Sequence, residues 1–568
     1  MTATWPKVLI VGLDGATFDN LEPWVEAGHL PTFKKILDGG TRGRLRSTFP
    51  PVTAPAWTSF MTGKNPGKHG LYHFIEPQPG GYELRYTNAR SRRAPTIWKL
   101  LGDAGLKVGA VNIPMTYPPE PVNGFMVAGM DAPEDSRAIT HPPELFDELS
   151  GRFSKVSKQI RYLGYLNSDD RRDALLLGLA EMDQHYLELC TYLFESRPVD
   201  VGMVVLTSTD TVQHFFYQYF DPQHPQHDPV GAKKYKDAIL DTYRRIDGIL
   251  AKMIERLPAD GTLMLMSDHG FRSTSGRVVH LNRFLEEAGL LVRRKPGPLA
   301  RLTRPVLKRI DGLLRGSLSP EQKARVAELL PGLRRKWESQ YAGFADIDWT
   351  KTRAYCYEVL TFPPGIWINT RGQRPQGVVE PGDEYQKLLA DITRRLLELK
   401  DPVTGTALVT RVYRKEEAYQ GPYLEHAPDL TVSWWDGITF LTKPSFGEGT
   451  VIDFVGGKPL EAGDWGGAHA LEGIVAMHGP AFRAGGRIPA DIVDVTPTLL
   501  YLLGLPVSDD MDGKVLVDAF TEAFASAHGL TTRKADGGPA GPSQGPQTYS
   551  DDESDKVAER LRGLGYMG

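Results

Sequence analysis

Residues 7–15 read KVLIVGLDG, and this stretch decides the fold. The run from Lys7 to Leu13 is apolar without alternation, which is typical of a strand buried on both faces of a parallel sheet. Asp14 follows at the carboxyl end of this strand, where open α/β sheets bind their ligands. An aspartate in this place also serves as a turn or cap residue. The stretch therefore predicts the first strand of a doubly wound, mostly parallel α/β sheet.

Two more apolar strands are predicted at Val199–Leu206 and Thr262–Met266, and each is followed by an aspartate and a histidine. These residues are Asp210, His214, Asp268 and His269. The first aspartate and histidine are four residues apart on a new helix, so they share a face and both reach one metal ion. Three strand ends that carry aspartates, two of them with histidines, favour metal ligands at one sheet edge over three separate caps.

A second stretch, residues 48–73, reads TFPPVTAPAWTSFMTGKNPGKHGLYH. Prolines keep its start irregular, and the run after Pro55 predicts one to two helical turns that end at Gly63. Thr53 stands just before this helix, and its hydroxyl points at a helix N-terminus, which suits a phosphate-like anion. A capping threonine is common and a nucleophilic one is rare, so the stretch alone leaves both interpretations open.

Length and composition limit the classes of protein to which the chain could belong. The chain has 568 residues, 41% of them hydrophobic, which fits one large domain with insertions as well as two domains. A net charge of −4 gives no general case for nucleic acid, and sequence-specific nucleic-acid binding is not expected. Cys190 and Cys356 are too few and too far apart for a disulfide framework. With no signal-peptide pattern and no run of about 18 apolar residues, the sequence predicts a cytoplasmic protein without a transmembrane segment.

The catalytic core is predicted to be discontinuous, over residues 1–290 and 345–520. Between these parts, residues 291–344 are rich in arginine and lysine with leucines at helical spacing, which predicts an inserted helical cap. A solvated face is its default role, and an anionic-substrate clamp, a partner element or peripheral membrane contact are the alternatives. Residues 525–548 are predicted to be a disordered linker, and 551–568 a short helix that docks on the body or on a partner.

The order of these polar residues resembles that of the alkaline phosphatase superfamily. It runs Asp14, Thr53, Asp210 with His214, Asp268 with His269, and then His469, which lies in a glycine-rich loop. The closest resemblance is to the type I phosphodiesterase/nucleotide pyrophosphatase branch. In that branch a nucleophilic threonine, followed after one residue by proline, precedes a Thr-Gly and a His-Gly pair. Here Thr53-Ala54-Pro55 precedes Thr62-Gly63 and His69-Gly70 at those spacings.

The resemblance implies an alkaline-phosphatase-like fold with two divalent metal ions, zinc first and manganese as the alternative. Asp14, Asp268, His269 and the Thr53 oxygen would hold one ion, and Asp210, His214 and His469 the other. A threonine hydroxyl is protonated at pH 7, so it needs a Lewis acid to become a nucleophile. The implied activity is a phosphohydrolase or phosphodiesterase that cleaves phosphate esters or pyrophosphates of a nucleotide-like or other small organophosphate through a phospho-threonine.

The sequence departs from the branch in one place. The asparagine that follows the His-Gly pair in relatives, and donates to a phosphate oxygen, corresponds here to Phe74, beside His73. His73, Lys64 or the arginines of 291–344 are the candidate substitutes. The choice between monoester, diester and pyrophosphate therefore stays open, and the sequence does not predict an oligomeric state.

Competing functions are a phosphomonoesterase or phosphomutase of the same superfamily, a sulfatase, and a non-catalytic nucleotide-sensing scaffold. A sulfatase needs a cysteine or serine nucleophile followed by x-Pro-x-Arg, whereas Thr53 is followed by Ala-Pro-Ala-Trp. A scaffold is disfavoured because no ligand of the set is lost, and closely packed carboxylates are costly without a bound cation.

Overall fold

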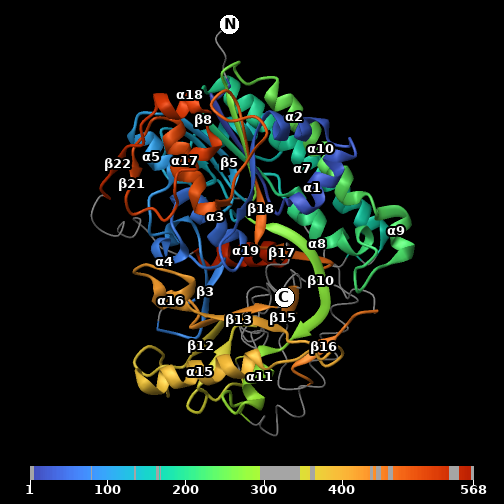
Figure 1. The fold of residues 1–568 in the computed structure, drawn as a ribbon, viewed down its shortest axis with the longest axis vertical. Coiled ribbons are helices and arrows are strands. Elements are labelled where there is room, and N and C mark those ends of the chain that lie inside the picture. Colours follow the sequence, from blue (N-terminus) through green and yellow to red (C-terminus); the bar gives the residue numbers. More distant parts are fainter. Residues whose placement is uncertain are drawn as a thin grey trace.

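A ten-stranded sheet forms the centre of the molecule (Figure 1). The computed structural model describes residues 5–78, 80–133, 136–160, 166, 168–294, 344, 346–358, 365–434, 439–442, 449–457, 465–535 and 549–563. The strands across this sheet are, in order, β19 (Gly486–Arg487), β2 (Gly40–Arg46), β18 (Glu472–His478), β9 (Thr262–Met266), β1 (Val8–Leu13), β8 (Val201–Leu206), β5 (Val108–Ile113), β6 (Gly124–Ala128) and β7 (Thr140–His141), and β20 (Ala490–Asp491) pairs with β2.

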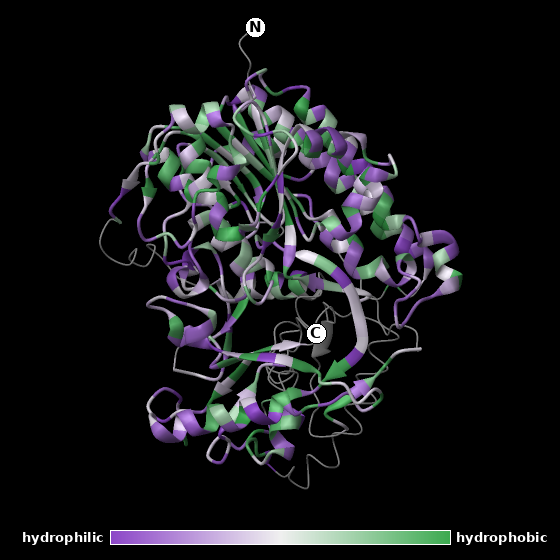
Figure 2. Ribbon diagram, viewed as in Figure 1, coloured by the Kyte–Doolittle hydropathy of each residue, from purple (hydrophilic) through white to green (hydrophobic). Residues whose placement is uncertain are grey.

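The middle of the sheet is parallel, as predicted. β1 runs parallel to β8 on one side and to β9 on the other, with Leu13 opposite Leu206 and Gly12 opposite Met266. Every residue of β1, β8 and β9 is buried, which explains their unbroken apolar sequences. Figure 2 shows these strands as a hydrophobic interior beneath more polar helices. The register brings the three carboxyl ends, and the polar residues that follow them, to one edge.

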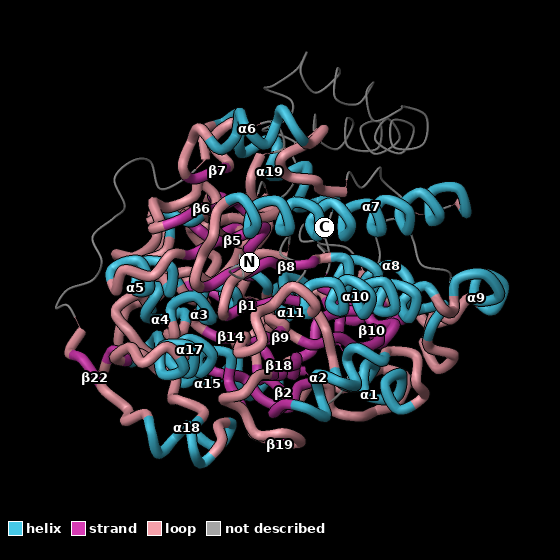
Figure 3. Tube along the Cα trace, turned by 90° about the horizontal axis from the view of Figure 1, so that it is seen from above, coloured by secondary structure: helices cyan, strands magenta, loops and turns pink. Residues whose placement is uncertain are grey.

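Helices cover both faces of this sheet. Figure 3 shows α3, α5 and α17 on one side of the strands and α7, α8 and α10 on the other. The helices are α1 (Phe18–Glu26), α2 (Pro31–Gly39), α3 (Thr53–Thr62), α4 (Pro66–His69), α5 (Ile97–Asp103), α6 (Leu145–Arg152), α7 (Asp169–Ser196), α8 (Ser208–Phe220), α9 (Pro229–Tyr235), α10 (Ala238–Ile254), α11 (Leu281–Glu287), α15 (Asp383–Leu397), α16 (Lys415–Ala418), α17 (Val495–Leu502), α18 (Glu522–Ala527) and α19 (Asp551–Gly563), with short 3₁₀ turns η1 (Ala89–Ser91), η2 (Leu424–His426), η3 (Ile492–Asp494) and η4 (Val517–Ala519). The predicted doubly wound α/β class is confirmed.

A second lobe lies below the central sheet in Figure 1. The long strand β10 (Gly270–Val279) leads toward it and pairs with β15 (Thr439–Thr442), β16 (Ile452–Phe454) and β17 (Gly467–Ala470). The lobe contains a separate antiparallel sheet, β11 (Ala354–Cys356), β12 (Gly365–Ile368), β14 (Leu430–Trp434) and β13 (Val409–Arg414), together with α15. Part of the predicted core segment 345–520 thus builds this lobe, while β18 returns to the central sheet, and the predicted domain division stays a prediction.

The remaining boundaries differ from the prediction in part. Most of the predicted insertion 291–344 lies outside the described residues. The predicted linker 525–548 begins with ordered structure, because α18 spans its start and β22 (Thr532–Arg533) pairs with β21 (Val507–Ser508). Residues 536–548 lie outside the described part. Two further strands, β3 (Ile75–Pro77) and β4 (Leu84–Tyr86), form a hairpin.

The C-terminal helix docks on the body, as predicted for 551–568. Tyr549, just before α19, stacks on Tyr117 with ring centroids 5.7 Å apart and donates to the carbonyl of Asp131 at 2.9 Å. Val557 and Leu561 are buried against the core. In the described parts of the chain, no helix has the length and apolar character needed to span a bilayer.

Candidate active site

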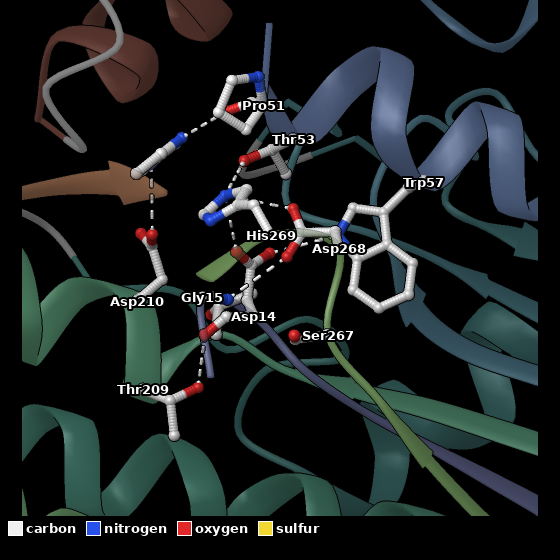
Figure 4. A network of polar contacts seen from close by, with 12 residues as sticks. Asp14, Gly15, Pro51, Thr53, Trp57, Thr209, Asp210, Ser267, Asp268 and His269 are labelled. Atoms are coloured by element: carbon white, nitrogen blue, oxygen red, sulfur yellow. Dashed lines mark hydrogen bonds and ion pairs between the residues drawn. The ribbon is translucent and has the colours of Figure 1, made fainter. Parts of the chain in front are cut away.

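The seven residues predicted as nucleophile and metal ligands come together at the carboxyl edge of the central sheet. Figure 4 shows five of them: Asp14, Thr53, Asp210, Asp268 and His269. Asp14 follows β1, and the Asp268–His269 pair lies between β9 and β10. Asp210 and His214 lie one turn apart on α8, His469 lies on β17, and Thr53 begins α3. All seven side chains are buried. Segments from residue 14 to residue 469 thus build one site.

Thr53 is the first helical residue of α3 and not its cap. The N-cap position is Val52, which makes no side-chain cap hydrogen bond, so the capping interpretation of Thr53 is wrong. The helix ends at Gly63 in the left-handed conformation (φ 67°), as predicted. Thr53 Oγ1 instead lies 3.2 Å from His269 Nε2. The hydroxyl therefore faces the polar cluster from a helix N-terminus.

One group of ligand atoms has the spacing of a metal site. His214 Nε2 lies 3.1 Å from His469 Nε2 and 3.3 Å from Asp210 Oδ1, and His469 Nε2 lies 3.4 Å from the same oxygen. Ligands about 2.0–2.1 Å from a tetrahedral ion stand roughly 3.3 Å apart. The three atoms therefore fit one ion without rearrangement.

A second group surrounds His269. Its Nε2 lies 3.2 Å from Asp268 Oδ2 and 3.6 Å from Asp14 Oδ1. The ligand atoms of Asp14, Asp210 and His269 also lie within 4.8 Å of one another. The predicted ligand set for this position had Asp14, Asp268, His269 and Thr53, so the structure adds Asp210, which lies within reach of both groups.

The imidazole rings are oriented as metal ligands are. Each ring has its Nδ1 within hydrogen-bond distance of a backbone carbonyl: His214 with Gly467 at 3.0 Å, His469 with Pro51 at 2.9 Å, and His269 with Gly270 at 3.0 Å. A carbonyl accepts only from N–H, so these contacts place the proton on Nδ1 and leave the Nε2 lone pair directed into the site. Two such lone pairs face each other in His214 and His469, an arrangement that a cation stabilises.

Among the residues that the structure describes, three carboxylate oxygens at the site find no hydrogen-bond partner. Asp14 Oδ1, Asp210 Oδ1 and Asp268 Oδ2 are all buried and unpartnered. The companion oxygens are held, because Trp57 Nε1 donates to Asp14 Oδ2 and the Gly15 amide donates to Asp268 Oδ1, each at 3.2 Å. Buried carboxylates without partners are costly. Their convergence on one place is the arrangement that a bound divalent cation would satisfy.

The electrostatics of the site lead to the same conclusion. Burial, Asp268 and Asp210 together raise the pKa of Asp14 well above its usual value, and burial above all raises the pKa of Asp268 to about 7. Burial depresses the pKa of His269 well below its ordinary range. Neutral imidazoles beside crowded carboxyl groups leave the site short of positive charge.

Several supporting residues escaped the sequence analysis. Trp57 orients Asp14 through its indole N–H. Thr209 Oγ1 donates to the Asp14 carbonyl at 2.6 Å, and Ser267 Oγ donates to the Ala16 carbonyl at 2.8 Å. Thr209 and Ser267 directly precede the ligands Asp210 and Asp268. Their position between a buried strand and a ligand could have indicated their supporting role. Trp57 lies one helical turn after Thr53, where the sequence indicates only a hydrophobic core residue.

The two residues predicted to contact substrate are engaged elsewhere. The Lys64 ammonium, mostly buried, forms an ion pair with Asp510, so its charge is already compensated. His73 is also buried, and its Nδ1 accepts from the Ile75 amide at 3.3 Å. Their role toward substrate stays a prediction.

A comparison with known families identifies the chain. The profile of the type I phosphodiesterase / nucleotide pyrophosphatase family matches residues 8–452. The chain belongs to this family. It is accordingly a metal-dependent hydrolase of phosphoric esters of the alkaline phosphatase superfamily, as the resemblance predicted. No curated protein matches the chain significantly.

Solved structures of this family and of related hydrolases are similar to the chain at low identity. Murine ectonucleotide pyrophosphatase/phosphodiesterase 5 is 16% identical over 88% of this chain and 95% of its own, with a TM-score of 0.47. The human protein is 15% identical over the same shares, with a TM-score of 0.45. Phosphonoacetate hydrolase from Sinorhizobium meliloti 1021, in complex with phosphonoacetate, is 15% identical over 87% of this chain and 95% of its own, with a TM-score of 0.47.

Proposed function

We propose that this family member is a two-metal phosphodiesterase or phosphohydrolase of small phosphorylated compounds, with Thr53 as its nucleophile. The observation that carries the proposal is the position of Thr53 Oγ1, 3.2 Å from His269 Nε2 in a buried cluster with three unpartnered carboxylate oxygens.

The residues would divide between two ions. Asp14, Asp268 and His269, with the Thr53 oxygen, would hold one, and Asp210, His214 and His469 would hold the other. Zinc is the first expectation, because nitrogen and carboxylate ligands at tetrahedral spacing suit it, and manganese is the alternative. The ions supply Lewis acidity, which makes a threonine oxygen nucleophilic at neutral pH and offsets the charge on the phosphoryl group.

The chain itself positions the reaction. Thr53 is fixed at the start of a wholly buried helix, so its oxygen is held in one place. The same N-terminus favours the negative charge of a phosphate group. The Thr53 oxygen bonds to phosphorus as its proton passes to solvent and the ester bond to the leaving group breaks. Water then attacks the phospho-threonine and frees Thr53, so two in-line displacements give net retention of configuration at phosphorus.

The proposal is tested on zinc-loaded protein with an aryl phosphate monoester and the matching diester. Thr53→Ala should keep its fold and its metals and lose turnover by roughly 10³-fold or more, because the displacement has no nucleophile. Thr53→Ser is the matched control and should retain part of the activity. Acid quench during turnover should leave phosphate on the peptide that contains Thr53. Wild-type turnover by Thr53→Ala would sink the proposal.

The two substrates decide the finer assignment. Preference for the diester supports a phosphodiesterase or pyrophosphatase, and preference for the monoester supports the phosphomonoesterase alternative. Isomerisation of a sugar or glycerate phosphate without release of phosphate supports the phosphomutase alternative. The cytoplasmic location also stays a prediction.

A further inference from the structure

We propose that Trp465 is a positioning residue for the metal ligand His214, and that its indole ring strengthens the binding of the ion assigned to Asp210, His214 and His469. The inference rests on the proposed function, because it takes this group of residues to hold an ion. Trp465 stands two residues before β17, the strand that carries His469. It is not a ligand itself, since an indole offers no lone pair to a metal ion.

Two aromatic rings pack on the His214 imidazole. The Trp465 ring centroid lies 3.9 Å from the imidazole centroid, with 40° between the ring planes. The Phe271 centroid lies 4.7 Å from the imidazole centroid at 76°, and Phe271 stands opposite His469 in the pairing of β10 with β17. All four side chains are buried. The neighbouring rings therefore restrict rotation of the imidazole.

The residues that follow Trp465 hold His214 as well. The Gly466 amide donates to the His214 carbonyl at 2.9 Å, and the Gly467 carbonyl accepts from His214 Nδ1 at 3.0 Å. Gly466 has no room for a side chain, because a Cβ atom there would stand 2.0 Å from Gln218 Oε1 and 3.0 Å from Gln218 N. The backbone that carries the indole thus contacts His214 at two points, which defines the position of the indole relative to the imidazole.

The indole contacts His214 rather than the second histidine of the group. The ring centroids of Trp465 and His469 are 6.4 Å apart, compared with 3.9 Å for Trp465 and His214. His469 instead stacks on His269, with centroids 3.6 Å apart and 19° between the planes. Loss of the indole should therefore weaken the ion assigned to His214 more than the ion assigned to His269.

The electrostatics of an aromatic face explain why the indole favours the metal-bound ligand. When His214 Nε2 donates its lone pair to a divalent ion, the imidazole becomes positively polarised. The face of an indole is negative and attracts positive charge within about 6 Å of its centroid. The neutral, metal-free imidazole gains less from this contact, so the contact adds to the affinity for the ion. A merely structural role for Trp465 would change the stability of the fold and leave the zinc affinity of the folded protein unchanged.

The first test measures zinc affinity of the full chain by competition with a chromogenic chelator. Trp465→Leu removes the aromatic face, and the zinc Kd of one of the two ions should rise roughly 10-fold or more. Trp465→Phe keeps an aromatic face and should retain most of the affinity. Trp367→Leu is the matched control, because Trp367 is also 5% exposed but packs on Tyr355 and Tyr357 in the second lobe. The control should bind zinc as the wild type does.

The second test uses tryptophan fluorescence, which a merely structural role would not couple to zinc. Stepwise addition of zinc to the metal-free protein should change the emission of Trp465. Trp57, which donates to Asp14, contributes a change of its own. The contribution of Trp465 is therefore the difference between the wild type and Trp465→Phe, and Trp367→Phe should show the full change of the wild type.

Unchanged zinc affinity in Trp465→Leu, or an equal loss in Trp367→Leu, would overturn the inference. An affinity of Trp465→Phe as low as that of Trp465→Leu would also overturn it. Thermal melts show which variants are folded. If Trp465→Leu is not folded, the emission difference between the wild type and Trp465→Phe decides, and absence of a difference overturns the inference. Neither readout needs turnover, so a protein that binds zinc but hydrolyses no phosphate ester would contradict the proposed function alone.

Discussion

Individual carboxylates of the site are oriented by hydrogen bonds so that one oxygen of each can bind a cation. Each of Asp14 and Asp268 has one oxygen held by a hydrogen bond and the other left unpartnered. Burial of a carboxylate with one unpartnered oxygen costs free energy on folding. A bound metal ion would offset that cost. The donors that hold the companion oxygens therefore contribute to metal binding through the ligands they orient.

Replacement of Trp57 by phenylalanine tests this support. Trp57→Phe keeps most of the buried ring and removes the N–H that donates to Asp14 Oδ2. Loss of such a second-layer hydrogen bond typically weakens metal binding by about 10- to 100-fold. Competition with a chromogenic chelator measures the zinc affinity. Trp98→Phe is the matched control, since its buried Nε1 has no partner, and equal losses in both variants would contradict the assignment.

Glu358 gives a pH-dependent prediction far from the metal ligands. Its Oε1 accepts from the Asn282 amide at 2.7 Å, and burial raises its pKa from the ordinary 4.5 to about 7. The folded state binds the proton more tightly than the unfolded state, so this group's contribution is largest below pH 4.5 and is lost as pH rises toward 7. The loss is roughly 3 kcal/mol.

Glu358→Gln should remove this dependence while it keeps the acceptor. Urea unfolding at pH 5 and pH 8 measures it as the difference between wild type and variant. The variant should gain stability relative to wild type at pH 8. A gain at pH 5 instead would mean that the sign is wrong.

At the scale of elements, α3 depends on its glycine end. Gly63 has φ 67°, and a Cβ there would stand 3.0 Å from Met511 Sδ. Gly105 also has a positive φ (83°), but nothing lies within 4 Å of its added Cβ. Gly105→Ala should lower the free energy of unfolding by about 1–2 kcal/mol, because alanine is strained in the left-handed conformation. Gly63→Ala should lower it further, and it should also reduce turnover because α3 carries Thr53. Thermal melts compare the stability losses of the two variants. An equal loss would mean that the Met511 side chain moves aside without cost.

The elements also show what the sequence could predict. Continuous apolar runs identified β1, β8 and β9, because strands buried on both faces have no alternation, and parallel pairing then put Asp14 and Asp268 at one edge. The sequence does not reveal that β11 to β14 form a sheet of their own, because the partners of these strands are set by tertiary pairing. The proximity of Asp210 to both ligand groups depends on the placement of α8 against β17, which no local pattern contains.

At the scale of the whole molecule, the two ligand groups join the central sheet to the β10 sheet. Removal of metal should therefore destabilise the entire protein. At free zinc near 1,000 times Kd, binding contributes about 4 kcal/mol. A chelator should lower the apparent Tm by several degrees, and excess zinc should restore it. Asp210→Asn, which alters a residue close to both groups, should show a smaller response, and a full response would contradict its assignment.

The order of the site residues along the chain has a consequence for biosynthesis. Asp14 directly follows β1, and His469 comes 455 residues later, so the nascent chain lacks the ligand set of Asp210, His214 and His469 until β17 has left the ribosome. At about 5–20 residues per second, the interval between the two residues is roughly 20–90 s. Loading of the ion assigned to His469 is therefore a late event, and a chain that stops short of residue 469 would lack one of the three ligands assigned to that ion.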